Sequence, residues 1–460
     1  MGNILRKILS DLNIGNNKIT DSTLENLAKD PKVDQLSQSI VSLKSQLVDI
    51  LNMHQATEDF KESHLIVPNA FVKKDYQFTF NLSEFPSISI KEIKNLDKIG
   101  LSYNSENGMI FGTPTVANSL EIEILFYNNL EENTTEHSKK ISFIVNADPK
   151  DLWLDKPSPK DHLYYKEENT SHYSTFLDKK IVVCSKRGRS HAHNGTFRED
   201  DFHTKNLPNG WAIIAVADGA GSSKFARAGS QLATEFIVKS FDNEELLNNL
   251  SQLATSYYSK ENNLNFNIQD KKSIINTLYK NVKLLSENLV KFSETNNLEI
   301  RDLHTTLIFT LVKKFSFGYV ILSFGVGDCP INVISKDESS VKLLNYLDVG
   351  ESSGSTRFIT MPEIFSDQEM MIKRFGIYCF DDFSKLTLMT DGIYDPKFVV
   401  ESKLENSKSW KEFLNDLDGN NEDQSKVNFE NDNNIETELS DWMDFWSKGN
   451  HDDRTLAIIY

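Results

Sequence analysis

Acidic residues follow apolar runs at several points of this 460-residue chain. The clearest run covers residues 211–217 and ends in Asp218 and Gly219. An unbroken apolar run is typical of a strand that is buried on both faces, and such a strand gives a carboxylate the stiff support that a metal site requires. A glycine directly after the acid lets backbone atoms approach whatever the acid binds. Similar places beside apolar runs are occupied by Asp328, Asp391-Gly392 and Asp452-Asp453.

Acids at the ends of strands can converge on one rim of a sheet. Carboxylates gathered there would repel each other, and would repel a phosphate, unless cations neutralised them. A ligand set made of oxygen atoms, without a cluster of Cys or His, suits Mg²⁺ or Mn²⁺ better than Zn²⁺. The sequence therefore predicts a divalent-cation site. Asp418-Gly419 lies among polar residues and is interpreted as a plain turn.

Composition excludes several classes of partner. The formal net charge of -17 argues against nucleic acid and anionic membranes, because both require a basic patch. No apolar run approaches the length of a membrane span, and the first six residues are too mixed for a signal peptide. Arg6 stands where a myristoylation pattern needs Ser or Thr. The three cysteines, an odd number at wide spacing, are expected to be buried free thiols, so a cytoplasmic location is predicted.

The supporting elements fall into four segments. Residues 1–64 are predicted to be helical, 65–148 to form β-structure, 149–172 to be a linker, and 173–460 to be a mixed α and β domain. The helical segment carries a heptad-like seam of apolar residues at Val33, Leu36, Ile40, Leu43, Leu47 and Ile50. Two interpretations are open: a small helical hairpin packed on a neighbouring part of the protein, which we favour, and self-association.

The β segment alternates apolar and polar residues, which is typical of a sheet with one solvated face. Its turn at Gly112-Thr113-Pro114 resembles the signature of bacterial immunoglobulin-like modules, which implies a binding or spacer β-sandwich. A plain hairpin with a proline turn is the alternative. Farther along, the polar and acidic stretch 397–450 is expected to be an inserted helical flap, partly disordered around 420–434.

The order of the acidic motifs in residues 181–460 resembles that of the metal-dependent Ser/Thr protein phosphatases of type 2C, in particular a bacterial branch. The motifs that carry the resemblance are Glu199-Asp200, Asp218-Gly219-x-Gly221, Thr305-Thr306, Gly327-Asp328, Asp391-Gly392-x-x-Asp395 and Asp452-Asp453-x-Thr455. The resemblance implies an α+β fold, in which the phosphatase domain has two packed β-sheets flanked by helices. It also implies a binuclear Mn²⁺ or Mg²⁺ centre, and some members hold a third ion.

Matched position by position, the family's pattern implies a role for each acid. Asp218 would bridge two ions, and Asp391 and Asp452 would complete the first site, so these three are the predicted catalytic residues. Glu199 and the Gly219 carbonyl would complete the second site, with Asp200 acting through bound water. Asp328 and Asp395 would hold a third, weaker ion. Two ions bridged by an aspartate can lower the pKa of a shared water, and the resulting hydroxide can attack phosphorus without a protein nucleophile.

Two positions depart from the family's pattern. Gly195 stands where many members place an arginine that grips the substrate phosphate, and Arg189, His191 and Arg198 are candidate replacements. Ala220 stands where eukaryotic members carry a histidine proposed as general acid. The predicted function is hydrolysis of phosphoserine and phosphothreonine in a phosphoprotein, with a Ser/Thr kinase as an implied partner.

Alternatives remain open beside this function. A catalytically weak phosphatase-like module that binds a phosphoprotein would account for the missing arginine, and a hydrolase of another phosphoester would account for the acids. His191 and His193 could form a metal pair of the kind found in barrel hydrolases, although a loop that contacts substrate or solvent is favoured.

Overall fold

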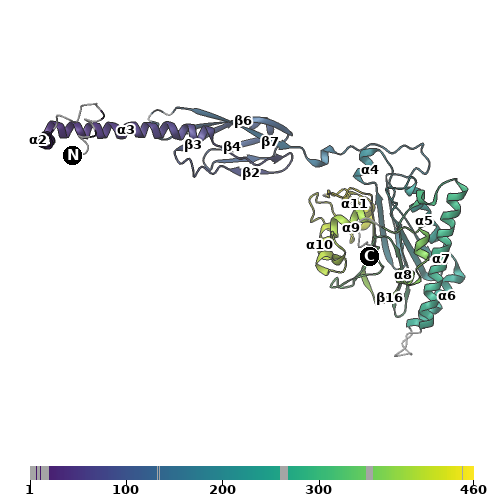
Figure 1. Cartoon of the computed structure of the whole chain (residues 1–460). Helices are drawn as coiled ribbons and strands as arrows, with labels where there is room; N and C mark the ends of the chain where they lie inside the picture. The colour runs from purple at the N-terminus through teal and green to yellow at the C-terminus, as the bar shows by residue number, and fades with distance from the viewer. Residues whose placement is uncertain are drawn as a thin grey trace. The chain divides into compact units, whose positions relative to one another are not determined.

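The computed structural model describes Lys7, Asp11 and residues 20–460, apart from 132, 134, 259–267, 349–355 and 448. The chain forms two compact units, Met1–Leu152 and Trp153–Tyr460 (Figure 1). The division between them falls inside the segment that was predicted as a linker. Within the described part of the chain, no helix is both long enough and apolar enough to cross a bilayer.

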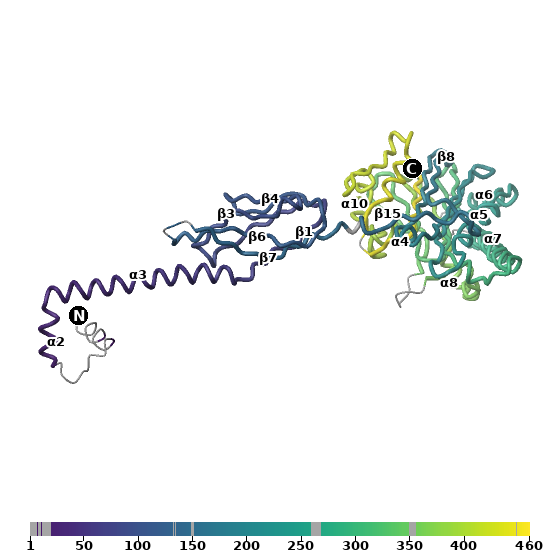
Figure 2. Tube along the Cα trace, turned by 90° about the horizontal axis from the view of Figure 1, so that it is seen from above, coloured from purple at the N-terminus to yellow at the C-terminus, as the bar shows by residue number. Residues whose placement is uncertain are grey.

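The helices of the first unit are α2 (Asp21–Ala28) and α3 (Pro31–Glu62). The Asp30 side chain caps α3 by accepting a hydrogen bond from the Lys32 amide at 2.8 Å, and proline occupies the first helical position. α3 is one continuous helix of 32 residues, which the trace of Figure 2 shows. α2 and α3 are joined through Lys29 and Asp30. The rest of the segment predicted as a helical hairpin, residues 1–19, lies outside the described residues except for Lys7 and Asp11, so the hairpin stays a prediction.

The C-terminal end of α3 is fixed to the strands of the first unit. Phe60 packs edge-on against Phe126 at a ring distance of 4.6 Å. The buried Lys139 ammonium donates hydrogen bonds to the backbone carbonyls of Phe60, Lys61 and Ser63 at 2.6–2.9 Å. A cation at the carbonyl end of a helix also interacts favourably with the helix dipole.

The strands of the first unit form two sheets that enclose one apolar core, so this unit is the predicted β-sandwich. The immunoglobulin-like assignment stays a prediction. Gly112 has φ 132°, and a Cβ there would lie 2.8 Å from the Gly100 carbonyl oxygen, so the turn requires glycine. One sheet has the order β1 (Ala70–Phe71), β7 (His137–Asn146), β6 (Asn118–Asn128), β3 (Ile88–Lys94), and the other β2 (Tyr76–Thr79), β5 (Met109–Gly112), β4 (Leu101–Asn104).

The second unit contains two antiparallel sheets packed face to face. The first sheet has the order β10 (Asp201–Leu207), β11 (Trp211–Ala217), β12 (Leu307–Phe315), β13 (Gly318–Val326), β16 (Phe375–Phe380). The second has the order β15 (Val341–Leu343), β14 (Ile331–Ser335), β17 (Phe383–Met389), β18 (Arg454–Ile459), β9 (Lys179–Lys186), β8 (Asn169–Phe176).

Helices cover the outer face of each sheet, which confirms the predicted α+β fold. The first sheet is covered by α5 (Ala226–Phe241), α6 (Glu244–Tyr258) and α7 (Ile268–Thr295), and the second by α9 (Asp391–Phe398), α10 (Ser407–Leu417) and α11 (Ile435–Trp442). The shorter helices are α4 (Arg189–Asn194) and α8 (Gln368–Lys373). Single 3₁₀ turns are η2 (Asp97–Ile99), η3 (Pro149–Leu152), η4 (Pro208–Gly210), η5 (Ile300–Leu303), η6 (Pro362–Phe365), η7 (Glu401–Lys403) and η8 (Asp432–Asn434).

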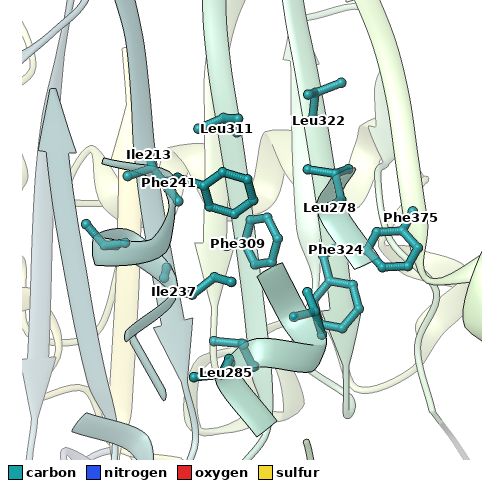
Figure 3. Close-up of a cluster of buried hydrophobic side chains, with 14 of the residues drawn as sticks. Ile213, Ile237, Phe241, Leu278, Leu285, Phe309, Leu311, Leu322, Phe324 and Phe375 are labelled. Atoms are coloured by element: carbon teal, nitrogen blue, oxygen red, sulfur yellow. The ribbon is translucent and has the colours of Figure 1, made fainter. Parts of the chain in front are cut away.

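The central strand β11 is buried along its whole length, because its two faces belong to different cores. Ile213 and Ala215 face the helices, whereas Ile214 and Val216 face the second sheet. Figure 3 shows the helix-side core, in which Phe309 and Phe324 of the sheet pack near side chains of α5 and α7.

The segment 397–450 differs from its prediction as a flap. Its side chains Trp410, Phe413 and Trp442 are buried in the core beneath α9–α11, so the segment is the helical layer of the second sheet. Trp410, Phe413, Trp442 and Phe445 were recognised in the sequence as anchors of this segment, but its average polarity suggested a flap where the structure has a packed layer. The expected disorder around 420–434 is replaced by ordered turns, in which Asn421 donates to the Asp416 and Ser425 carbonyls at 2.7 Å.

Candidate metal centre

Asp218 directly follows β11 and is held by its backbone. The Thr306 hydroxyl accepts a hydrogen bond from the Asp218 amide at 2.9 Å. The Asp218 carbonyl accepts one from the Thr305 hydroxyl and one from the Thr306 amide, each at 2.8 Å. The threonine pair thus holds both the amide and the carbonyl of Asp218.

Asp391, the first residue of α9, meets Asp218 across the rim of the two sheets. Burial, and after it the negative charges of Asp391, Asp200, Asp452 and Asp328, raise the pKa of Asp218 well above its usual value. Burial and the charges of Asp452, Asp328 and Asp200 raise the pKa of Asp391 in the same way. Five of the predicted acids therefore act on one another in the folded protein.

Glu199 and Asp200 approach the same rim from the segment before β10. Burial, together with the charge of Asp453, raises the pKa of Glu199 to about 7, although the positive charge of His191 opposes this. Asp200 is buried, and one of its oxygens accepts hydrogen bonds from the Thr390 and Thr455 hydroxyls at 2.8 and 2.7 Å. Burial and the charge of Asp453 raise the pKa of Asp200 to about 8.

Three glycines let the chain segments approach at this rim. A Cβ at Gly219 would lie 2.6 Å from the Glu199 carbonyl oxygen. Cβ atoms at Gly188 and Gly392 would lie 2.3 Å from the Asp452 carbonyl carbon and 1.9 Å from the Asp453 carbonyl oxygen. No side chain fits at these distances, so the acids can come together only because glycine occupies the crossings.

Asp452 and Asp453 precede β18 and differ in their surroundings. Asp452 is exposed on one side and lies 3.5 Å from the His191 imidazole Nε2. Burial raises the pKa of Asp452, but the hydrogen bond from His191, the Asp453 amide and the charge of His191 together lower it below its usual value. Asp453 is buried and accepts hydrogen bonds from the backbone amides of Gly188 and Glu199. Ligand atoms of His191, Asp452 and Asp453 all lie within 4.8 Å of one another.

The three candidates for a phosphate grip have different environments. Arg198 is only 3% exposed, and its guanidinium donates to the Ser185 hydroxyl and to the Asp200 carbonyl, each at 2.6 Å. It therefore serves the scaffold and is not placed to meet a substrate. Arg189 donates to the Asp444 carbonyl at 2.6 Å and lies over the Trp446 ring.

The third candidate, His191 of α4, lies beside the acid Asp452. Burial lowers the pKa of His191, but the charges of Asp453, Asp452 and Glu199 outweigh this and raise it to about 9. His193 is turned away from this group, because its Nδ1 accepts the Leu154 amide at 3.2 Å and its ring contacts Trp153. The paired-histidine alternative therefore has no support in the geometry. Gly195 ends α4 with φ 72°, a conformation that an arginine would adopt only with strain.

The two acids predicted for a third ion lie near the same rim. The Asp328 carboxylate accepts a hydrogen bond from the Thr356 hydroxyl at 3.0 Å, and the Asp395 carboxylate accepts one from the Asn450 amide at 3.3 Å. Burial and the charge of Asp395 raise the pKa of Asp328, and burial with the charge of Asp452 raises that of Asp395. Burial also raises the pKa of the neighbouring Cys329 thiol well above its usual value, so this cysteine is no nucleophile.

Two residues of the site, Lys166 and Asp453, were not singled out from the sequence. Lys166 is buried; its ammonium pairs with Asp201 at 2.9 Å and donates to the Asp200 carbonyl at 2.6 Å. Asp453 was recognised only as part of a motif, although a second acid directly before a buried strand was a usable signal. Nothing in the pattern around Lys166 identified it, because it lies in a polar stretch that was interpreted as a linker.

The sequence model of protein phosphatase 2C matches residues 187–444, more than half of the chain. This chain belongs to the protein phosphatase 2C family. As a member, it is a metal-dependent protein-serine/threonine phosphatase, and Mn²⁺ or Mg²⁺ is its cofactor, as predicted. No curated protein matches the sequence significantly.

Solved structures similar to this phosphatase include a serine/threonine phosphatase from Staphylococcus aureus, at 16% identity and a TM-score of 0.36, covering 64% of this chain and 98% of that one. The serine/threonine phosphatase of S. agalactiae shares 13% identity with a TM-score of 0.37, covering 61% and 99% of the two chains. The catalytic domain of the phosphatase PstP, solved with two manganese ions, shares 14% identity with a TM-score of 0.34, covering 63% and 98%. The family assignment rests on the sequence match.

The site of this phosphatase fits divalent cations on its own chemistry. Within the described parts of the chain, Glu199 Oε2 and Asp391 Oδ1 are buried and have no hydrogen-bond partner. Burying a carboxylate oxygen without a hydrogen-bond partner reduces the stability of the folded protein, and a bound cation would compensate for the missing partner. All the acids involved offer oxygen, the ligand atom that Mg²⁺ and Mn²⁺ prefer.

Proposed function

We propose that this phosphatase holds two Mn²⁺ or Mg²⁺ ions at the rim where Asp218 and Asp391 meet. Asp218 would bind both ions. Asp391 and Asp452 would complete one site, and Glu199 with the Gly219 carbonyl the other. Asp200 would act through water. Two observations carry the proposal. The charges of Asp200, Asp328 and Asp452 raise the pKa of both Asp218 and Asp391, so these acids lie together. Among the described residues, buried oxygens of Glu199 and Asp391 also have no hydrogen-bond partner.

When bound, the ions supply Lewis-acid chemistry that lowers the pKa of a water and neutralises the phosphoryl oxygens. The chain contributes position and charge. Thr305 and Thr306 hold the Asp218 backbone, so its carboxylate has a fixed direction. Asp453 holds the Glu199 amide, and the Thr390 and Thr455 hydroxyls orient Asp200. A site built this way needs little reorganisation when substrate binds.

His191 and Arg189 remain the proposed contacts for the substrate phosphate. His191 lies beside Asp452 and carries a raised pKa, so its imidazolium is a cation placed at the rim. Arg189 is half-buried on the same helix and stacks on Trp446, which keeps its guanidinium near the edge of the site. Asp328 and Asp395 are proposed to bind a third, weaker ion together with Asp391.

The proposed substrates are phosphoserine and phosphothreonine side chains of a cytoplasmic phosphoprotein, and a Ser/Thr kinase is the proposed partner. The helical region and the β-sandwich would place the enzyme on that partner or substrate. The rival proposal is a module that binds a phosphoprotein without turnover, motivated by Gly195. The retained set of acids favours the enzyme, because a binding module needs no such set.

The test measures hydrolysis of an aryl phosphate and a phosphothreonine peptide with EDTA, Mg²⁺ or Mn²⁺. Wild type and Asp218→Ala are compared with Asp418→Ala. This control alters an Asp-Gly pair outside the site, whose acid pairs with Lys426 on the surface. We expect metal-dependent turnover in wild type and Asp418→Ala, and none in Asp218→Ala. Absence of turnover in folded wild-type protein would favour the binding module. Full activity of Asp218→Ala would overturn the metal assignment.

A further inference from the structure

The long helix α3 exposes a row of large apolar side chains. We call Val33, Leu36, Ile40, Leu43, Leu47 and Ile50 the α3 seam. Leu36, Leu43 and Leu47 expose 63%, 59% and 67% of their surface, and Ile50 exposes 50%. Val33 and Ile40 are half-buried. Contiguous apolar surface of this kind marks a site of interaction when it lies on one face of an element.

The spacing along the α3 seam is that of a coiled coil. Its members alternate at three and four residues, which places Val33, Ile40 and Leu47 at the first core position of each heptad. The second core positions are Leu36, Leu43 and Ile50. In the first two heptads a β-branched residue precedes leucine, the pattern that favours two parallel strands.

We propose that the α3 seam binds the same seam of a second copy of this chain, as a parallel two-stranded coiled coil. A partner with an identical heptad pattern fits in register over all six positions. The favoured hairpin interpretation gives no such fit among the described residues, because α2 has only eight residues and none of them is buried.

Charges beside the seam are compatible with this pairing. In a parallel pair, the residue before each first core position faces a residue five places later in the other copy. Lys32 then faces Ser37, and Ser39 faces Lys44. Farther along, Gln46 faces Leu51 and Met53 faces Glu58. No like charges meet, so nothing at these positions opposes the dimer.

The area is sufficient for a specific contact. Full burial of a Val, Leu or Ile side chain removes roughly 60–120 Å² of apolar surface from water. Twelve seam side chains in two copies would bury on the order of 1,000 Å², which is about the smallest area expected of a specific interface. The C-terminal end of α3, beyond the seam, packs on the β-sandwich of its own chain through Phe60 and Lys139. That contact leaves the seam itself uncovered.

The experiment measures the mass of the full chain in solution by sedimentation equilibrium at micromolar concentration. The double substitution Leu43→Lys with Leu47→Lys places two charges in the seam. The control, Ser45→Lys with Asn52→Lys, adds the same charges on the opposite face of α3. We expect wild type and the control to have the mass of two chains and the seam variant that of one. Metal-dependent phosphatase activity in all three checks folding, since none of these residues belongs to the metal centre.

The orientation is tested by Leu36→Cys, which lies near one end of the seam. Equal positions meet there only in a parallel, in-register pair, because an antiparallel pair aligned over the seam would place Leu36 opposite Leu47. Oxidation should give a reducible cross-linked dimer that wild type, with its native cysteines, does not give. A monomeric wild type would overturn the proposal; slow hydrogen exchange along α3 in that monomer would identify a segment of the same chain as the occupant. A dimer that survives in the seam variant would overturn the proposed interface. A dimer that fails to cross-link through Leu36→Cys would overturn its orientation.

Discussion

The carboxylate of Asp453 accepts a hydrogen bond from the backbone amide of Gly188 at 2.6 Å. Its other oxygen accepts a hydrogen bond from the backbone amide of Glu199. A single buried side chain just before β18, the last strand of the chain, therefore holds two segments that come early in the sequence of the phosphatase unit. Glu199 and Asp452 are both proposed metal ligands. Asp453 therefore fixes the backbone on which both proposed ligands lie.

Asp453→Ala is expected to weaken metal binding. The change leaves two buried amide donors without their acceptor, at a cost of about 1–3 kcal/mol each, and frees Glu199 to move. Loss of a residue that orients a ligand typically reduces metal affinity about 10–100-fold. Activity measured against Mn²⁺ concentration should show a higher half-saturation point, with partial recovery at saturating Mn²⁺. Asp418→Ala serves as the matched control, and an unchanged Mn²⁺ dependence in Asp453→Ala would show that Glu199 needs no such support.

The sequence predicted the acids of the site because their signal is local. Asp218 follows a run of seven apolar residues, and a buried strand must end where a charge begins. The roles of Asp453 and Lys166 depend instead on partners more than thirty residues away in the chain. Asp453 contacts Gly188, and Lys166 contacts Asp200, and no spacing rule links such positions.

The contrast between local sequence signals and contacts of distant residues also explains which parts of the fold were predicted. Residues 229–241 carry apolar side chains at helical spacing, a local signal, and they lie in α5. The layer made by 397–450 buries few but large side chains, such as Trp410 and Trp442, in a segment that is polar on average. Mean polarity therefore suggested a flap where aromatic anchors make a core.

The metal-free protein should lose stability as pH rises from 5 to 8. The folded pKa values of Glu199 and Asp200 are about 7 and about 8, above the value of about 4 that carboxyl groups have in an unfolded chain. A raised folded pKa contributes stability that is complete below the unfolded pKa and is lost as pH rises through the folded pKa. Each whole pKa unit of difference corresponds to about 1.4 kcal/mol. His191, whose pKa is raised to about 9, acts in the same direction at higher pH.

Thermal unfolding in EDTA at pH 5, 6, 7 and 8 measures this loss. Saturating Mn²⁺ should remove most of the pH dependence, because cations then neutralise the carboxylates that protons neutralise at low pH. Asp200→Asn should flatten the metal-free curve, since a neutral amide does not titrate. A metal-free unfolding temperature that rises between pH 5 and pH 8 would contradict the charge cluster described here.

Substitutions of the three positively charged side chains near the site, Arg189, His191 and Arg198, should have two kinds of effect, one on stability and one on substrate binding. Arg198→Gln is expected to reduce stability, because the buried guanidinium serves the Ser185 hydroxyl and the Asp200 carbonyl. His191→Gln and Arg189→Gln should leave the unfolding temperature nearly unchanged in the presence of Mn²⁺ and raise KM for a phosphothreonine peptide. Steady-state kinetics and thermal unfolding on the same preparations separate the two. A higher KM with unaltered stability for Arg198→Gln would return that residue to the substrate contacts.

The phosphatase unit should require the residues before 173, which were predicted to be a linker. Lys166 is buried beneath the metal centre and pairs with Asp201. The buried Arg187 guanidinium, in turn, donates to Asp155 at 2.9 Å and to the Ser158 hydroxyl at 2.7 Å. A chain that begins at Trp153 keeps these contacts and should retain Mn²⁺-dependent activity. A chain that begins at Tyr173 leaves buried charges without partners and shortens β8, so it should be insoluble or inactive.

Lys166→Met in the chain that begins at Trp153 isolates one of these contacts. Removing one partner of a buried ion pair typically costs about 3–5 kcal/mol, because the other charge stays buried and uncompensated. The matched control is Lys160→Met, a lysine of the same segment that is exposed. Urea unfolding should place the midpoint of Lys166→Met well below that of the control. Equal midpoints, or full activity of the chain that begins at Tyr173, would mean that the domain starts where the sequence pattern first indicated.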